Sequence, residues 1–133
     1  MATQYSVAAR TSQMSQLNTT IGINAQIILY TGAAPANVGT AASGTLLVQL
    51  AGNATAFGAA ATAVLTASAV ASVNATAAGV AGYYRINTSA GVAVTQGTIT
   101  GTGGGGDMIL TNTNIAAAQA CNFNSLTITA FGV

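Results

Sequence analysis

Few residues in this 133-residue chain could do chemistry, because only Arg10, Arg85 and Asp107 carry a charged side chain. There is no lysine, glutamate or histidine, and Cys121 is the single cysteine. Acid–base catalysis needs a histidine, a carboxylate pair or a tuned lysine, and a nucleophilic cysteine needs a neighbouring base. Zinc needs cysteine and histidine ligands, and calcium needs several carboxylates. The sequence therefore predicts a protein that is not an enzyme and has no metal or cofactor.

The same shortage of charge limits the kinds of partner that the protein can bind. A formal net charge of +1 gives no electrostatic footprint for nucleic acid, which requires clusters of lysine and arginine. The most apolar section, residues 59–73, contains threonines and serines and is shorter than the roughly 20 apolar residues of a membrane helix. We therefore expect neither a nucleic acid nor a membrane as partner. Cys121 has no cysteine to pair with and is expected to be a small buried thiol.

The most conspicuous local motif is the glycine-rich run at residues 101–106, followed by Asp107. Such a loop beside an acid could cradle a phosphate or help to hold a cation. However, no lysine and no predicted helix follow it, so the known phosphate-loop patterns do not apply. The run instead favours a tight hairpin turn between strands at 92–100 and 107–111, with glycine supplying positive φ angles.

Arg85 lies in the middle of a predicted strand, directly after Tyr83 and Tyr84. One interpretation is a contact residue that stacks on, or forms a bidentate bond with, a partner. The other is a solvated cation that stacks on a tyrosine or pairs with Asp107, the only acidic side chain. The second interpretation is favoured.

Three Thr-x-Thr units begin at Thr98, Thr111 and Thr127, and each places two hydroxyls on one side of an extended chain. A flat array of such units could bind ordered water or a polysaccharide. Threonine also simply fills the solvent face of a strand, and that interpretation is favoured here.

Residues 3–18 are the helical candidate. Val7, Met14, Leu17 and Ile21 follow one another at helical spacing, which places them on one stripe, and Gly22 provides a stop. Beyond this point the apolar period falls to two, which predicts strands at 25–31, 45–50, 63–73, 82–88, 92–100, 107–111 and 123–131. The alanine-rich stretch 59–73 could instead form a helix, although its alternation favours a strand.

These elements predict a mainly β fold, an antiparallel, jelly-roll-like β-sandwich of about seven or eight strands with one N-terminal α-helix. We expect an N-terminal arm and helix over 1–22 and the sandwich domain over 23–133. Because much of the apolar content is alanine, the core supports only modest stability, and self-association would add buried area. A homo-oligomer is therefore expected, with a trimer as one arrangement.

Several landmarks occur in a recognisable order: Tyr5–Arg10, Ile28–Asn37, Ala78–Ile86, Thr95–Ile99 and Asn112–Gln119. In this order the chain resembles a family of small structural proteins of tailed bacteriophages and prophages, over nearly its whole length. The resemblance implies a virion component without catalytic or cofactor residues.

The leading hypothesis is a capsid decoration (cement) protein on the virion surface that contacts the major capsid protein and copies of itself. The helix and the arm before it would be the docking element. The residues expected at capsid or other partner contacts are Val7, Arg10, Met14, Leu17, Tyr83 and Arg85. The alternatives are a tail or fibre-associated protein that contacts host glycans, and a free-standing ice- or polysaccharide-binding protein.

Overall fold

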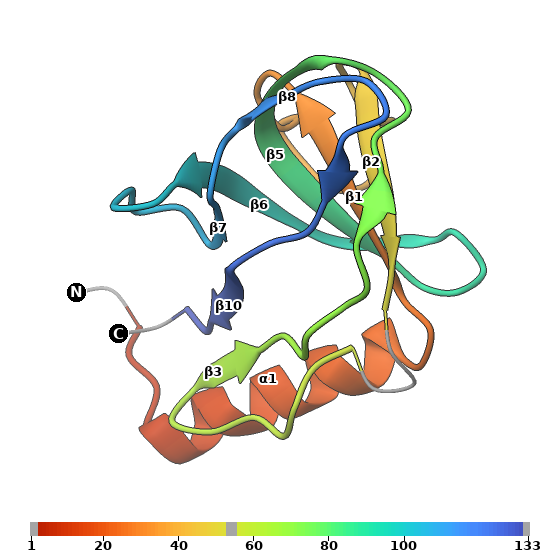
Figure 1. Ribbon diagram of the computed structural model, residues 1–133. Helices are drawn as coiled ribbons and strands as arrows, with labels where there is room; N and C mark the ends of the chain where they lie inside the picture. The colour runs from red at the N-terminus through yellow and green to blue at the C-terminus, as the bar shows by residue number, and fades with distance from the viewer. Residues whose placement is uncertain (1–2, 53–55, 132–133) are drawn as a thin grey trace.

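The computed structural model describes residues 3–52 and 56–131 (Figure 1). Within these residues the chain forms one helix, α1 (Val7–Ile21), followed by strands only. The strands are β1 (Gln26–Thr31), β2 (Leu46–Ala51), β3 (Val64–Thr66), β4 (Val73–Asn74), β5 (Gly79–Asn87), β6 (Ala93–Gly101), β7 (Met108–Leu110), β8 (Asn114–Ile115), β9 (Ala120–Cys121) and β10 (Ser125–Thr129).

Helix α1 lies somewhat later in the chain than predicted, because its caps decide where it begins and ends. The Ser6 hydroxyl accepts a hydrogen bond from the Ala9 N–H at 3.2 Å, as an N-cap residue does. At the other end Gly22 has a positive φ of 73°, and its N–H donates to the Asn18 carbonyl at 3.0 Å. Hydroxyls within the helix donate to the carbonyl four residues earlier, so this serine- and threonine-rich segment satisfies its own polar groups.

Eight strands form one sheet, in the order β2-β1-β5-β6-β7-β10-β3, with β8 paired to β5. A second sheet consists of β4 and β9. Figure 1 shows β4 and β9 in front of β1 and β2, and α1 across the end of the sheet where β3 lies. The prediction of a mainly β protein with one N-terminal helix is confirmed.

The core lies on one face of the long sheet. Leu29 in β1 is paired with Val48 in β2 and Tyr84 in β5, and all three side chains are buried. Residues in such register share a face, because side chains alternate along each strand. Met14 and Ile21 of α1 belong to the same apolar cluster as these sheet residues. The helix therefore contributes to the core that the strands form.

The predicted strand at 63–73 is wrong, because the structure divides it between two sheets. β3 pairs with β10, whereas β4 pairs with β9. Between them the chain crosses over, and the Ala67 and Ser68 N–H groups bond to the carbonyls of Leu126 and Ala56. The alternative of a helix over 59–73 is also wrong.

The predicted hairpin at the glycine run is wrong as well. β6 and β7 are parallel, with Ile99 beside Met108 and Gly101 beside Leu110. The turn itself is present: Gly103 has a φ of 87°, and the Gly104 N–H donates to the Gly101 carbonyl at 3.0 Å. The Gly106 N–H donates to the Thr100 hydroxyl at 3.0 Å. The loop therefore returns alongside β6 before β7 starts in the same direction.

Candidate functional site

The residues predicted on α1 differ in how accessible they are. Val7 is 48% exposed, and Arg10 and Leu17 are half-buried. Met14 is buried in the protein's own core, as is Ile21. The apolar stripe of the helix thus faces inward rather than toward a partner. Of these α1 residues only Val7 is well exposed.

Arg85 is not a solvated cation, because only 4% of its surface is exposed. It lies on β5 opposite Gln96 of β6, and its Nη2 donates to Gln96 Oε1 at 2.8 Å. Its Nη1 donates to the Thr40 carbonyl at 2.9 Å. Gln96 Nε2 in turn donates to the Pro35 carbonyl at 2.7 Å. The expected pairing with Asp107 is therefore replaced by bonds to uncharged oxygens of β6 and of the 32–45 loop, which joins β1 to β2.

Tyr83 is completely buried and holds the same loop. Its hydroxyl donates to the Ser43 carbonyl at 2.7 Å and accepts from the Ser43 N–H at 3.0 Å. Its ring stacks on Tyr30, with centroids 5.1 Å apart and planes 12° from parallel. Tyr83 and Arg85 were predicted as partner contacts, but their burial leaves them unavailable on the surface. Their role is to fasten the 32–45 loop to the outer face of the sheet.

Asp107 is exposed, and its Oδ2 accepts a hydrogen bond from the Thr98 N–H at 3.3 Å. The buried Tyr84 ring lies over Gly97 beside this carboxylate. Burial and, to a smaller degree, the Asp107 charge raise the pKa of Tyr84 well above its ordinary value of 10.0. The Tyr84 phenol is therefore neutral near neutral pH, and its ring belongs to the apolar core.

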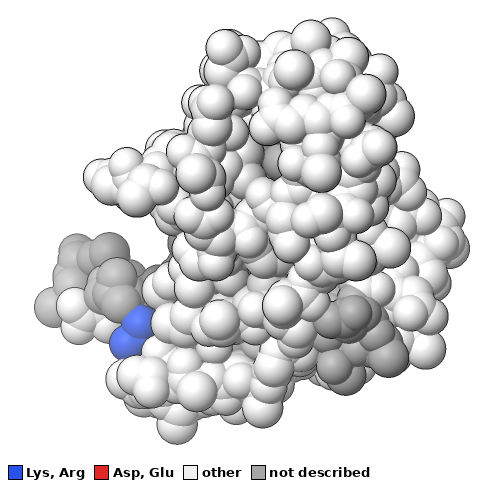
Figure 2. Space-filling view, in the orientation of Figure 1, with Lys and Arg blue, Asp and Glu red and all other residues white. Residues whose placement is uncertain are grey.

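Little charge therefore remains at the surface of the folded protein. Of the three charged side chains, Arg85 is buried, Arg10 is half-buried and Asp107 is exposed. Figure 2 shows one face with a single small blue area and no red. Exposed large apolar side chains are present instead, and they are Tyr5, Val7, Ile23, Val73, Val80, Val92 and Phe131.

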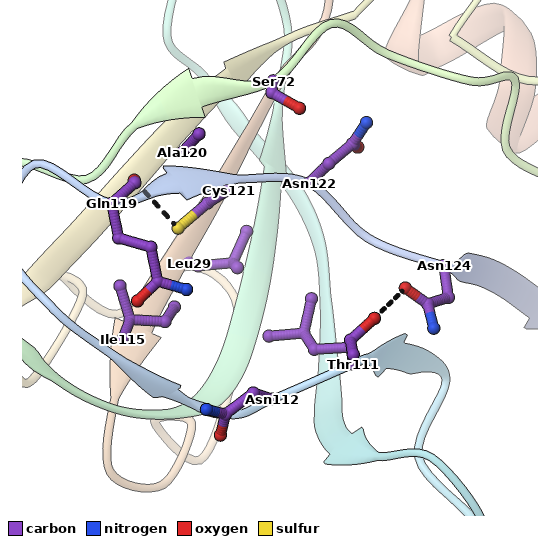
Figure 3. Close-up of a pocket in the computed structure, with 11 residues that line it drawn as sticks. Leu29, Ser72, Thr111, Asn112, Ile115, Gln119, Ala120, Cys121, Asn122 and Asn124 are labelled. Atoms are coloured by element: carbon purple, nitrogen blue, oxygen red, sulfur yellow. Dashed lines mark hydrogen bonds between the residues drawn. The ribbon is translucent and has the colours of Figure 1, made fainter.

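A cavity of about 280 Å³ lies under the segment that runs from β7 to β10 (Figure 3). Apolar side chains of Leu29, Leu110 and Ile115 contribute to its lining. Ala120 and Cys121 also line it, and its polar lining residues are Ser72, Thr111, Asn112, Gln119, Asn122 and Asn124. No charged side chain is among the lining residues. No sequence motif marks this site, although five amide residues lie between positions 112 and 124.

Cys121 also lines this cavity, and the prediction of a small buried thiol is confirmed. Its Sγ donates to the Gln119 carbonyl at 3.4 Å. Burial raises the pKa of the Cys121 thiol above its ordinary value. The group therefore stays protonated near neutral pH and is a poor nucleophile.

A second cavity, of about 420 Å³, lies between α1 and the sheet. Its lining includes Met14 and Leu17 of α1, Val94 of β6 and Ile128 of β10. Phe131, which also lines it, is 89% exposed. This end of the molecule thus presents apolar surface to solvent.

The Thr-x-Thr units do not form one array. Thr98 and Thr100 lie on β6, Thr127 and Thr129 lie on β10, and β7 stands between these two strands. The third unit, at Thr111, lies outside the strands. Among the described residues, the three units thus do not combine into one flat hydroxyl surface.

No protein-family model, curated protein or solved structure matches the chain. The resemblance to phage virion proteins therefore stays a hypothesis that rests on the sequence landmarks. In the described residues, the single helix is too short and too polar to cross a bilayer.

Proposed function

We propose that the protein is a non-enzymatic structural component of a tailed-phage virion, a decoration protein that binds the major capsid protein and further copies of itself. The observation that carries this proposal is the near absence of charge at the folded surface, where Asp107 is exposed and Arg10 is half-buried. A charge-poor surface lets many copies meet without mutual repulsion and without the cost of desolvating ions.

The exposed apolar side chains give such contacts a source of free energy. Each side chain of this size contributes about 1.5–3 kcal/mol when it is fully removed from water. Phe131 and Val7 are accessible without any rearrangement of the fold. We therefore assign the capsid or self contact to these residues, in place of the buried Met14, Tyr83 and Arg85.

Immunogold electron microscopy of intact virions, produced from a genome that encodes this chain, tests the proposal. Dense label over the whole head supports a decoration protein. Label confined to the tail contradicts it and favours the tail or fibre position. Virions from which the gene has been deleted provide the control, and they should lose the label and break at a lower temperature. Wild-type particles that carry no label contradict a place on the virion surface.

A further inference from the structure

The cavity beneath residues 110–124 carries three side-chain amides whose oxygens each accept a hydrogen bond, and backbone N–H groups fix the orientation of two of them. Asn112 Oδ1 accepts from the Asn114 N–H at 2.9 Å, and Gln119 Oε1 accepts from the Ala116 N–H at 2.9 Å. Because a backbone N–H can only donate, these bonds fix which end of each amide is oxygen. The third amide, Asn124, accepts from the Thr111 hydroxyl at 2.9 Å.

All three residues are exposed, and their NH₂ groups make no hydrogen bond within the described part of the chain, so these groups are open to water or to a ligand. Figure 3 shows Gln119 and Asn124 on opposite sides of the cavity, with Asn112 at its rim. The rim therefore offers donors from several directions. A matching ligand must present acceptor oxygens around its edge.

The other properties of the cavity narrow the class of ligand. Leu29, Leu110 and Ile115 provide aliphatic surface against which a C–H face can pack. The lining has no charged side chain, which leaves an ionic ligand without a counter-charge. A volume of about 280 Å³ lies just below the roughly 300–1,000 Å³ typical of drug-sized ligands. A single six-membered sugar ring combines this size with a hydroxylated edge and an aliphatic face.

We propose that this cavity binds one uncharged pyranose ring of a glycan, with hydroxyl oxygens accepting hydrogen bonds from Asn112, Gln119 and Asn124. The site has no aromatic side chain among its lining residues, so the sugar ring has no stacking platform. A ligand of this size with such contacts binds with a dissociation constant of about 1 mM. This inference does not depend on where in a virion the protein lies.

The first test uses the full chain, labelled with ¹⁵N, and titrates it with methyl glycosides of glucose, galactose and N-acetylglucosamine. We expect at least one of these sugars to cause saturable NMR shifts confined to the residues that line the cavity, which are Leu29, Ser72 and members of the 110–124 segment, and to the three side-chain NH₂ groups. Shifts that do not saturate, shifts spread over other strands, or no shift with any of the three sugars would overturn the proposal.

The second test removes donors without removing the bonds that hold the loop. Gln119→Glu and Asn112→Asp each keep the oxygen that accepts a backbone N–H and lose the NH₂ group. We expect each variant to lower the affinity for the sugar about three- to tenfold, which is the effect of losing one hydrogen bond. Asn37→Asp is the matched control, because Asn37 Oδ1 accepts from the Thr40 N–H in the 32–45 loop, outside the cavity. The affinity of the Asn37→Asp variant for the sugar should equal that of the wild type.

A third variant tests whether a large side chain that fills the cavity blocks sugar binding. Ser72→Trp leaves all three amides in place and puts a large side chain at an exposed position on the lining. We expect it to abolish binding while the rest of the NMR spectrum is unchanged. Wild-type affinity in Ser72→Trp and in Gln119→Glu would show that the sugar binds elsewhere and would overturn the assignment.

Discussion

At the scale of single residues, this chain uses its rare polar groups to hold loops rather than to react. Arg85 and Gln96 form a short chain of bonds from β5 to the carbonyls of Thr40 and Pro35. A buried guanidinium with uncharged acceptors is costly unless its donors are satisfied. In Arg85 both terminal nitrogens donate hydrogen bonds, whereas the buried Nε has no hydrogen-bond partner among the described residues, so the guanidinium holds the loop at an energetic cost.

Tyr83→Phe tests this fastening role. The substitution leaves the Ser43 N–H and carbonyl without the hydroxyl that now bonds to both. We expect a loss of about 1–3 kcal/mol in the free energy of unfolding, measured by chemical denaturation, together with faster hydrogen exchange in the 32–45 loop. Tyr30→Phe is the control, because it keeps the stacked ring, and it should change stability by less than about 0.5 kcal/mol. Equal effects in both variants would contradict the assigned role of the Tyr83 hydroxyl.

Tyr84 makes stability sensitive to alkaline pH. Its pKa is raised in the folded state, so above an ordinary value of 10.0 the unfolded chain loses a proton that the folded chain keeps. The contribution of Tyr84 to stability is therefore full below about pH 10 and falls above it, by up to about 1.4 kcal/mol per pH unit. Denaturation at about pH 8 and about pH 11 measures this loss. Tyr84→Phe should make the difference smaller, and an unchanged slope in that variant would contradict the assignment.

At the scale of elements, the helix is part of the core and not a detachable arm. Ile21 is 1% exposed and lies in the same cluster as the strand residues. Ile21→Ala should cost about 2–5 kcal/mol through lost burial and a residual cavity, measured by chemical denaturation. Val7→Ala, at an exposed position of the same helix, should cost less than about 0.5 kcal/mol. Deletion of residues 1–22 should leave no cooperatively folded domain, and a stable truncated chain would show that the sheet folds alone.

The helix and six of the seven predicted strand segments match the structure within a few residues, because these depend on apolar period and on glycine stops, whereas the two-residue strands β8 and β9 were not predicted. The pattern at 63–73 failed for a physical reason. Alternation continues through both β3 and β4, so nothing local marks the change of sheet after Thr66. The parallel pairing of β6 with β7 was also hidden, because a glycine run permits a turn without fixing the direction of the strand that follows it.

The site was harder to predict than the fold. Tyr83 and Arg85 were predicted to contact a partner because they combine an aromatic ring with a cation. The loop that covers them comes from residues 32–45, which are far away in sequence. Conversely, Asn112, Gln119 and Asn124 carry no recognisable motif, and only the fold brings them around one cavity. Burial of a polar residue depends on distant segments, so spacing alone does not reveal it.

At the scale of the whole molecule, stability and association should respond weakly to salt. The folded surface carries few charges that a salt could screen, and apolar side chains supply the available contact energy. We expect sedimentation velocity to show concentration-dependent oligomers whose dissociation constant changes less than about threefold between low and high salt. A strong dependence on salt would contradict association through an uncharged surface.

Phe131 is the best candidate for that contact, because its ring is 89% exposed and lies beside the cavity between α1 and the sheet. Phe131→Ser removes most of this ring without touching the core, and should weaken self-association about tenfold or more, since a buried aromatic ring contributes roughly 1.5–3 kcal/mol. Val92→Ser is the matched control, because Val92 is also exposed but lies in the turn between β5 and β6. Equal weakening in both variants would indicate non-specific association. Weakening in Val92→Ser alone would move the contact to the turn between β5 and β6.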